Sequence, residues 1–231
     1  GHTNSSNRLK VYETMIRRGK AVVTAKSKKA PIRVSTLRMK MFKDKTLSEL
    51  YSLIGGTDKH NYHRYDGLYG PILKSKRFTA KKVLEVGVSC WGSGDLEALG
   101  HYFPNAEVHG IDTDPLERVK EEHQAPNIIF HQMDGYDYKS LDETFGDSKW
   151  DVVLDDGPHT IESQIKCLNY FHDKLAPNGV IIVEDIQRAH ENPSPFTEIR
   201  NAFEGTDMYL SFIDRHRGAC VDDMLAMYWV E

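Results

Sequence analysis

Two short apolar runs of the chain each end in acidic residues. The first belongs to residues 151–159 and the second to residues 180–185. Each run is typical of a short strand that is buried on both faces of a parallel sheet. Ligands of open parallel sheets bind outside the carboxyl ends of the strands. We therefore expect the polar side chains that follow the two runs to converge on one site: Asp156, His159, Glu184 and Asp185.

The types of these side chains point to metal and proton chemistry. Carboxylate oxygens are hard ligands of the kind that Mg²⁺ and Mn²⁺ bind, and a neighbouring imidazole can act as a general base. Asp156, Glu184 and Asp185 are thus candidate metal ligands, and Asp156 and His159 are candidate catalytic residues. Two plainer interpretations stay open. His159 could simply begin a helix, and Glu184 and Asp185 could lie on a solvated rim.

A glycine-containing loop follows the strand predicted at residues 83–88. Its glycines, Gly87, Gly92 and Gly94, do not have the G-x-G-x-x-G spacing of dinucleotide-binding loops. Glu85 lies just before the turn, where an acid would repel a pyrophosphate. An acid there suits a ligand with a cationic amino-acid end, such as S-adenosylmethionine. The alternative is that the glycines only permit the turn and that Glu85 pairs with a nearby lysine.

Two further acids lie where a nucleoside would need them. Asp112 follows Gly94 by 18 residues and ends the next predicted strand. In dinucleotide-binding folds an acid about 20 residues after the glycine loop binds the ribose hydroxyls. Asp134 follows the third predicted strand and is placed to reach the far end of a nucleoside. The order of these features favours a nucleoside-containing cofactor over a purely structural loop.

Apolar runs alternate with helical patterns from Lys82 onward, which predicts a parallel sheet with helices on both faces. The last two runs lack a full helix between them and predict an antiparallel hairpin. The fold class is therefore α/β, a three-layer, doubly wound, mostly parallel seven-stranded sheet with a C-terminal hairpin. The predicted strands are at residues 83–88, 108–111, 128–130, 152–154, 180–183, 208–214 and 225–230. Helices are predicted at residues 46–54 and 66–77, from Asp114-Pro115, and along the apolar face of Ile161, Ile165, Leu168, Phe171 and Leu175.

The start of the chain differs from the rest in charge. Residues 8–45 contain 13 Lys and Arg residues but only two acids, whereas the 231-residue chain has a net charge of −4. We predict a basic arm or linker at residues 1–45, with a short helix at residues 7–18, and one domain at residues 46–231. Such an arm can contact nucleic acid, an anionic surface or another chain. It holds few aromatic residues for stacking on bases, so a solvated linker is favoured over nucleic-acid binding.

Hydropathy and cysteine content bear on the cellular compartment of the protein. No apolar run has the length that a membrane span needs. Three widely spaced cysteines, Cys90, Cys167 and Cys220, form neither a disulfide framework nor a zinc pattern. They favour a reducing, cytoplasmic compartment. Because the chain begins without Met, we expect it to be part of a longer chain, with other domains of a glycan-modifying enzyme as candidate partners.

These motifs together resemble the class I S-adenosylmethionine-dependent methyltransferases. The Glu85-x-Gly87 loop, Asp112 and Asp134 match the cofactor motifs of that family. Within it, the chain is similar to the metal-dependent sugar O-methyltransferases that act on macrolides and cell-surface glycans. The segments that carry this closer likeness are Gly56–Lys59, Tyr102–Ala106, Asp155–His159 and Glu184-Asp185. The likeness covers residues 55 to about 190, and the first 45 residues do not match.

The resemblance implies a role for each matching position. Asp156, Glu184 and Asp185 would bind Mg²⁺ (or Mn²⁺), and His159 would be the general base. Pro158 replaces a serine of the family's motif and removes its hydroxyl. The acceptor would be a hydroxyl of a sugar or glycan. S-adenosyl-L-methionine would be bound by Glu85, Gly87, Ser89, Asp112, Thr113, Asp134, Gly135 and Asp155.

Several alternatives stay open at this point. The acceptor could be a catechol or another non-sugar natural product, and the chain could form an oligomer. The segment of Thr57, Asp58 and Lys59 could be a lid or a plain surface loop. Three tyrosines could stack on a sugar ring, although packing on the core is the favoured use: Tyr62, Tyr65 and Tyr69.

Overall fold

A computed structural model describes residues 40–187, 194–214 and 224–229. The helix predicted at residues 7–18, most of the basic arm and Cys220 lie outside the described residues. Phe42, which the predicted domain boundary places in the arm, is 2% exposed and packs against His101 with ring centroids 4.3 Å apart. The folded core therefore includes at least the end of the predicted arm.

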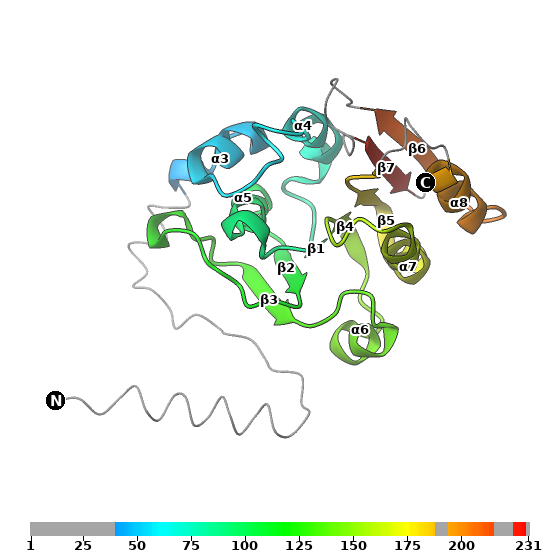
Figure 1. Cartoon of the computed structure of the whole chain (residues 1–231). Coiled ribbons are helices and arrows are strands. Elements are labelled where there is room, and N and C mark those ends of the chain that lie inside the picture. The colour runs from blue at the N-terminus through cyan, green and yellow to red at the C-terminus, as the bar shows by residue number, and fades with distance from the viewer. Residues whose placement is uncertain (1–39, 188–193, 215–223, 230–231) are drawn as a thin grey trace.

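The centre of the fold is one sheet with the strand order β3-β2-β1-β4-β5-β7-β6 (Figure 1). Neighbouring strands from β3 to β5 run parallel, whereas β7 pairs antiparallel with both β5 and β6. The mostly parallel α/β sheet and its C-terminal hairpin are thus confirmed. The strands are β1 (Lys82–Val86), β2 (Glu107–Asp112), β3 (Ile128–Gln132), β4 (Trp150–Asp155), β5 (Leu175–Val183), β6 (Tyr209–Asp214) and β7 (Met224–Trp229).

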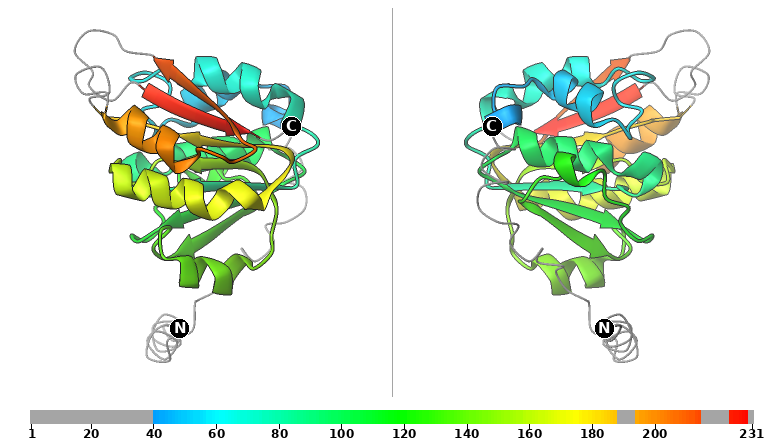
Figure 2. Two further views of the ribbon diagram at one scale, coloured as in Figure 1. Left: turned by 90° about the vertical axis from the view of Figure 1, so that its right-hand side faces the viewer. Right: turned by 90° about the vertical axis from the view of Figure 1, so that its left-hand side faces the viewer.

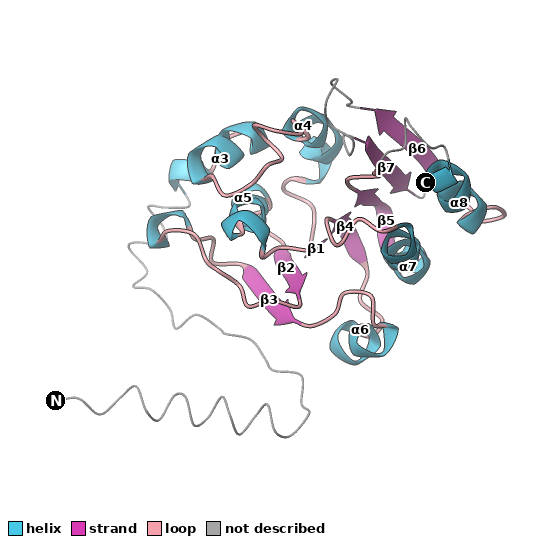
Figure 3. Ribbon diagram, in the orientation of Figure 1, coloured by secondary structure: helices cyan, strands magenta, loops and turns pink. Residues whose placement is uncertain are grey.

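Helices cover both faces of this sheet, as Figures 1 and 2 show, and Figure 3 marks each element by type. One apolar cluster lies under α3, α4 and α5, and a second lies under α6, α7 and α8. Short 3₁₀ helices join several elements: η1 (Lys74–Lys76), η2 (Cys90–Gly92), η3 (Glu121–His123) and η4 (His172–Lys174). The α-helices are α3 (Leu47–Ile54), α4 (Asp66–Leu73), α5 (Gly94–Tyr102), α6 (Tyr138–Phe145), α7 (Ile161–Phe171) and α8 (Ser194–Ala202).

Local capping explains where two of these helices begin. Thr46 and Glu49 form the predicted capping box of α3, since each side chain accepts a hydrogen bond from the other's backbone N–H. The Thr160 side chain likewise accepts from the N–H of Ser163 at the start of α7. The α7 start matters for the site, because it fixes the end of the loop that carries His159.

The helix predicted from Asp114-Pro115 is absent. In residues 113–127, all of which are described, the only helical turn is η3. Tertiary contacts explain the difference. Arg118 pairs with the buried Glu97 of α5 and donates to the carbonyl of Ala125 at 3.2 Å. These contacts hold the segment as an extended loop against α5, and they outweigh its local helix signals.

No helix within the described ranges is long and apolar enough to cross a membrane. This finding agrees with the hydropathy of the sequence.

Asp155, which the resemblance assigns to the cofactor, ends β4 on the face that packs against α6 and α7. It lies beside Val86 in register, whereas Glu85 lies beside Leu154 and faces the opposite helices. The Asp155 carboxylate is 2% exposed and accepts a hydrogen bond from the Tyr136 hydroxyl at 2.5 Å. Burial raises the pKa of Asp155 from 3.8 to about 6, although the hydrogen bond from Tyr136 opposes the shift. The Asp155 side chain therefore packs in the core of this face, on the opposite side of the sheet from Glu85.

This shift predicts a pH dependence of stability. The folded state binds the Asp155 proton more tightly than the unfolded state, so its contribution is full below pH 3.8 and is lost as pH rises through about 6. In the wild type, this loss lowers the unfolding free energy by roughly 1–2 kcal/mol between pH 5 and pH 8. The Asp155→Asn variant should lack this part of the pH dependence. Urea unfolding at the two pH values measures this, with the exposed Asp147→Asn as control. An unchanged pH profile for Asp155→Asn would contradict the assignment.

Candidate active site

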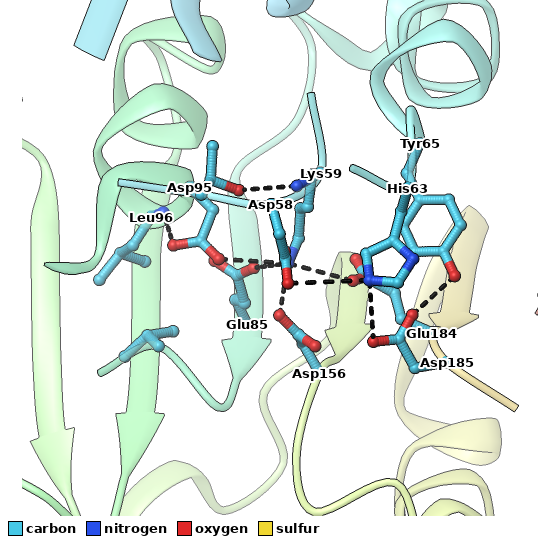
Figure 4. Close-up of polar contacts among 12 residues, drawn as sticks. Asp58, Lys59, His63, Tyr65, Glu85, Asp95, Leu96, Asp156, Glu184 and Asp185 are labelled. Atoms are coloured by element: carbon cyan, nitrogen blue, oxygen red, sulfur yellow. Dashed lines mark hydrogen bonds and ion pairs between the residues drawn. The ribbon is translucent and has the colours of Figure 1, made fainter. Parts of the chain in front are cut away.

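The carboxyl ends of β1, β4 and β5 bring together the acids that the sequence singled out. These strands are neighbours in the sheet, and their acids face α3, α4 and α5 (Figure 4). The predicted convergence of Asp156, Glu184 and Asp185 is therefore confirmed, with Glu85 joining them from β1. Asp95, at the start of α5, adds a further buried carboxylate that the sequence reading missed.

The centre of this cluster is the ammonium of Lys59. Its Nζ lies 3.5 Å from Glu85 Oε1, 3.2 Å from Asp95 Oδ2 and 3.0 Å from Glu184 Oε2. It also forms an ion pair and hydrogen bond with Asp156. The Lys59 side chain is 0% exposed. The open interpretation that Glu85 pairs with a nearby lysine is therefore correct, and Lys59 is neither a lid residue nor part of a plain surface loop.

Burial and mutual repulsion set the charges here. Burial by itself would lower the pKa of Lys59, but the carboxylates led by Asp156 outweigh it and hold that pKa well above its usual value. Burial raises the pKa of Glu85 well above its usual range and that of Glu184 to about 7. Lys59 stays charged, and the cluster has more acids than this one ammonium can neutralise.

Two tyrosines of the 60–70 segment orient the acids of β5. The Tyr65 hydroxyl donates to Asp185 Oδ1 at 2.6 Å, and the Tyr69 hydroxyl donates to Glu184 Oε1. Both tyrosines are 0% exposed. They pack in the core, and their hydroxyls bind the acids that follow β5. For these two tyrosines, packing on the core is confirmed over stacking on a sugar ring. Tyr62, by contrast, is 59% exposed.

Asp156, His159 and Asp185 form a group whose ligand atoms lie within 4.8 Å of one another. His159 Nε2 is 3.8 Å from Asp156 Oδ1 and 3.6 Å from Asp185 Oδ2. His159 and Asp185 both have left-handed backbones, with φ of 55° and 53°. Such conformations cost free energy in residues with a Cβ and concentrate at functional sites. Glu184 is not part of this group, because its two oxygens face Tyr69 and Lys59.

The residues assigned to the cofactor divide into two kinds. Asp112 ends β2, and its Oδ2 accepts from the backbone N–H groups of Val88 and Ser89 at 2.9 and 2.8 Å. This carboxylate thereby holds the glycine loop, and Gly92 of that loop has open space where a Cβ would stand. Asp134 is exposed at the adjacent edge and closes its own turn by accepting from Tyr136 N–H at 2.8 Å.

The other assigned residues act through the backbone or through packing. A Cβ on Gly87 would lie 1.9 Å from the carbonyl oxygen of Asp156, and one on Gly135 would lie 2.5 Å from Val86 Cγ1. Both positions thus require glycine for packing. Thr113 is exposed, and its carbonyl accepts from Gln132 Nε2 at 3.0 Å.

The segment before Lys59 packs directly on the start of α5. Gly94 donates its backbone N–H to the carbonyl of Gly56 at 2.9 Å, and a Cβ on Gly94 would lie 1.6 Å from the carbonyl oxygen of Gly55. The glycine at position 94 therefore serves this close backbone contact. It joins the Gly56–Lys59 segment to the glycine loop.

A pocket of about 660 Å³ opens beside the candidate metal group. It is lined by Gly56, Thr57, Asp58, Tyr62, His63, His159 and Asp185. His63 Nε2 lies 3.7 Å from Asp58 Oδ2 and 3.8 Å from Asp185 Oδ2, so it joins the two sides of the pocket (Figure 4). A molecule in this pocket contacts His159 and Asp185 directly.

Sequence comparison finds a family match for the part of the chain that carries most of these acids. Residues 85–186 match the family model described as a methyltransferase domain. The chain is 28% identical over 140 residues to 8-demethyl-8-alpha-L-rhamnosyl tetracenomycin-C 2'-O-methyltransferase of Streptomyces olivaceus, covering 58% of this chain and 36% of the relative. It is 25% identical over 133 residues to demethylmacrocin O-methyltransferase of Streptomyces fradiae, covering 55% and 33%. The chain thus matches about a third of the length of these curated relatives.

Solved structures agree in fold. The MycE methyltransferase of the mycinamycin biosynthetic pathway, in complex with Mg, SAH and mycinamycin VI, has a TM-score of 0.55 and 25% identity, covering 65% of this chain and 39% of MycE. The O-methyltransferase TomG of Streptomyces achromogenes, in complex with SAM, has a TM-score of 0.57 and 13% identity, covering 99% of both chains. Residues 85–186 thus match a methyltransferase domain by sequence, and the sheet order agrees with the fold of these two methyltransferases, which were solved with SAH or SAM.

Proposed function

We propose that this chain is an S-adenosylmethionine-dependent O-methyltransferase that methylates a hydroxyl of a sugar or glycan, with Mg²⁺ assistance and His159 as the general base. The observation that carries the proposal is the pocket, since His159 and Asp185 line it beside the buried acids of β1 and β4. The names of the two relatives, both O-methyltransferases, support it. The sugar acceptor is supported by the rhamnosyl substrate in the name of the first relative.

The cofactor side has features that fit S-adenosylmethionine. The buried Glu85 carboxylate pairs with Lys59 at 3.5 Å, and neither of its oxygens accepts a hydrogen bond among the described residues. An acidic environment of this kind favours the sulfonium and ammonium of the cofactor. Asp112 can accept ribose hydroxyls while it holds the loop, because each carboxylate oxygen has two lone pairs. The open space at Gly92 allows a ligand to approach the backbone closely.

The pocket side has features that fit a divalent cation. Asp156 and Asp185 offer carboxylate oxygens within 4.8 Å of each other and of a His159 nitrogen. Mg²⁺ is commonly held by one or two carboxylates together with water. A bound Mg²⁺ supplies a positive charge that stabilises an oxyanion of the acceptor. Glu184, the third carboxylate of the predicted ligand set, pairs with Lys59 at 3.0 Å and accepts a hydrogen bond from Tyr69.

The residues of the chain do the proton and positioning work. His159 takes the proton of the acceptor hydroxyl on Nε2, and the oxygens of Asp156 and Asp185, at 3.8 and 3.6 Å, favour the resulting imidazolium. The acceptor oxygen then takes the methyl group of the cofactor, whose sulfonium becomes a neutral thioether. The exposed ring of Tyr62 on the pocket wall offers an apolar face to a sugar ring. The buried side chains around Lys59 exclude water from the cofactor side.

The cofactor assignment predicts the effect of Asp112→Ala. The variant removes an acceptor for the ribose and releases the N–H groups of Val88 and Ser89. Affinity for S-adenosylmethionine should fall about tenfold to a hundredfold, as for loss of a hydrogen bond to a charged group. Calorimetric titration measures it, with the exposed neighbour Asp114→Ala as the matched control. Equal affinities for the two variants would refute the ribose assignment.

The base assignment predicts a separation of binding from turnover. His159→Ala should lower kcat by about a hundredfold or more, because a positioned general base contributes that much. Its dissociation constant for S-adenosylmethionine should stay within about twofold, since His159 lies on the pocket side. His172→Ala, at the far end of α7, serves as control. Near-normal turnover of His159→Ala would exclude His159 as the base.

The metal assignment predicts that chelation removes activity and that Mg²⁺ or Mn²⁺ restores it. Asp185→Asn should weaken Mn²⁺ binding about tenfold or more, because it removes one charged ligand. Electron paramagnetic resonance of free Mn²⁺ measures the affinity without any need for turnover. Full activity in excess chelator would show that the reaction does not use a metal.

A further inference from the structure

One short segment, residues 56–63, builds most of the wall of the pocket. Among the residues that the structure describes, only His159 and Asp185 line it from elsewhere. The proposed function assigns His159 to proton transfer and Asp185 to metal binding. Two polar side chains of the segment, Asp58 and His63, line the same pocket and have no part in either step. They are therefore candidates for binding the acceptor itself.

The segment holds these two side chains in fixed positions. The carbonyl of Asp58 accepts hydrogen bonds from the backbone N–H groups of Tyr62 and His63 at 3.0 and 3.1 Å, which closes a turn. The neighbouring Lys59 is buried among its ion pairs. The His63 ring stacks on the buried ring of Tyr65, with centroids 5.0 Å apart and planes inclined by 14°. The turn thus keeps Asp58 beside an imidazole whose orientation the core sets.

The gap between the two side chains has the width that one oxygen atom bridges. Asp58 Oδ2 lies 3.7 Å from His63 Nε2, which is too far for a direct hydrogen bond (Figure 4). An oxygen between them can form a hydrogen bond of about 2.8 Å to each. The Asp58 side chain is 31% exposed and that of His63 is 4% exposed, so the gap is open on the Asp58 side.

A hydroxyl matches the two groups chemically. Asp185 Oδ2 also faces His63 Nε2, at 3.8 Å. Two carboxylates beside the same nitrogen favour the tautomer that carries its hydrogen on Nε2, so this nitrogen donates. A hydroxyl can accept from Nε2 and donate to the Asp58 carboxylate, which only accepts. A ligand group that only donates or only accepts satisfies one of the two.

The gap also lies near the proposed base. Asp185 Oδ2 is 3.6 Å from His159 Nε2, so the two imidazoles stand on either side of one carboxylate oxygen. Two hydroxyls of one sugar ring can therefore reach both imidazoles. One of them gives its proton to His159, and the other binds between Asp58 and His63.

We propose that Asp58 and His63 are specificity-determining residues that bind a second hydroxyl of the acceptor ring while His159 acts on the first. This inference rests on the proposed function and narrows its substrate class. The preferred acceptor carries at least two free hydroxyls on one ring, and a ring with a single hydroxyl is a poor acceptor. The physical reason is that a site built to hydrogen-bond a substrate hydroxyl discriminates against the analogue that lacks it.

Binding of a sugar and its deoxy analogues tests the proposal without turnover. The probes are methyl α-L-rhamnopyranoside and its monodeoxy analogues at each ring hydroxyl, titrated into the chain with Mg²⁺ and S-adenosylhomocysteine present. Ligand-observed NMR measures each dissociation constant. For the wild type, at least one analogue should bind about tenfold to a hundredfold more weakly than the parent sugar, as for loss of a hydrogen bond to a charged group. Asp58→Ala should bind that analogue and the parent within about twofold of each other.

Further variants remove or keep each side of the gap. Asp58→Ala leaves the turn in place, since the turn uses the carbonyl of Asp58. His63→Phe keeps an aromatic ring against Tyr65 but removes Nε2, and it should equalise the same pair of sugars. Asp58→Asn keeps a side-chain oxygen and should keep part of the discrimination. Asn61→Ala changes an exposed residue of the same turn and should keep all of it.

The ratio of affinities separates this role from a merely structural one. A variant that only loosens the pocket binds the parent sugar and every analogue more weakly, with their ratios unchanged. A variant that removes the partner of one hydroxyl lowers the affinity of the parent to that of one analogue. Unchanged ratios in both Asp58→Ala and His63→Phe would refute the proposal.

Failure of the second-hydroxyl site and failure of the proposed function give different results. Equal binding of the parent sugar and all its analogues by the wild type refutes the second-hydroxyl site alone. Binding of the parent without any methyl transfer from S-adenosylmethionine refutes the proposed function. A chain that binds S-adenosylmethionine but none of the sugars contradicts the sugar acceptor, and with it both.

Discussion

The structure of this site depends on one buried ammonium. Lys59 stands among acids from β1, α5, β4 and β5, and these elements would otherwise place like charges against one another in a region without solvent. Its ion pairs offset that repulsion. They also connect the segment that precedes α4 to the ends of β1, β4 and β5. The tyrosines of the same segment continue the link, since their hydroxyls hold the acids that end β5. Side chains of the segment that precedes and begins α4 therefore hold the buried acids at the ends of the strands in place.

This arrangement divides the site into two environments. On the sealed side, Glu85 and Asp95 face Lys59 beneath the glycine loop. On the open side, His159 and Asp185 face the pocket, both in left-handed backbone conformations that the surrounding contacts hold in place. Asp156 lies at the border and contacts both sides. A methyl transfer between two ligands needs this kind of division, with one ligand held in each environment and the reacting atoms meeting at the border.

The order of elements and the acids at the strand ends could be predicted from the sequence. Buried strands read as continuous apolar runs, and parallel strands place their ends at one edge, so the convergence of Asp156, Glu184 and Asp185 follows from pattern alone. The helix expected from Asp114 failed because Arg118 and its partner Glu97 override local propensity. The resemblance assigns Asp155 to the cofactor, and the structure shows its side chain on the opposite face of the sheet from Glu85, because side chains alternate along a strand.

The sequence by itself determined the class of fold, the glycine loop and the set of acids, because periodicity and strand ends are local properties of the chain. Only the tertiary structure decided how those acids are paired. Lys59 lies 36 positions from Asp95 and 97 from Asp156, and no local signal reports which carboxylate an ammonium will meet. The partners of Glu184, the role of Tyr65 and Tyr69, and the position of the pocket likewise follow from the packing of residues 55–69 over the sheet. Contacts between segments distant in the chain depend on the whole fold, and so does the charge balance that they create.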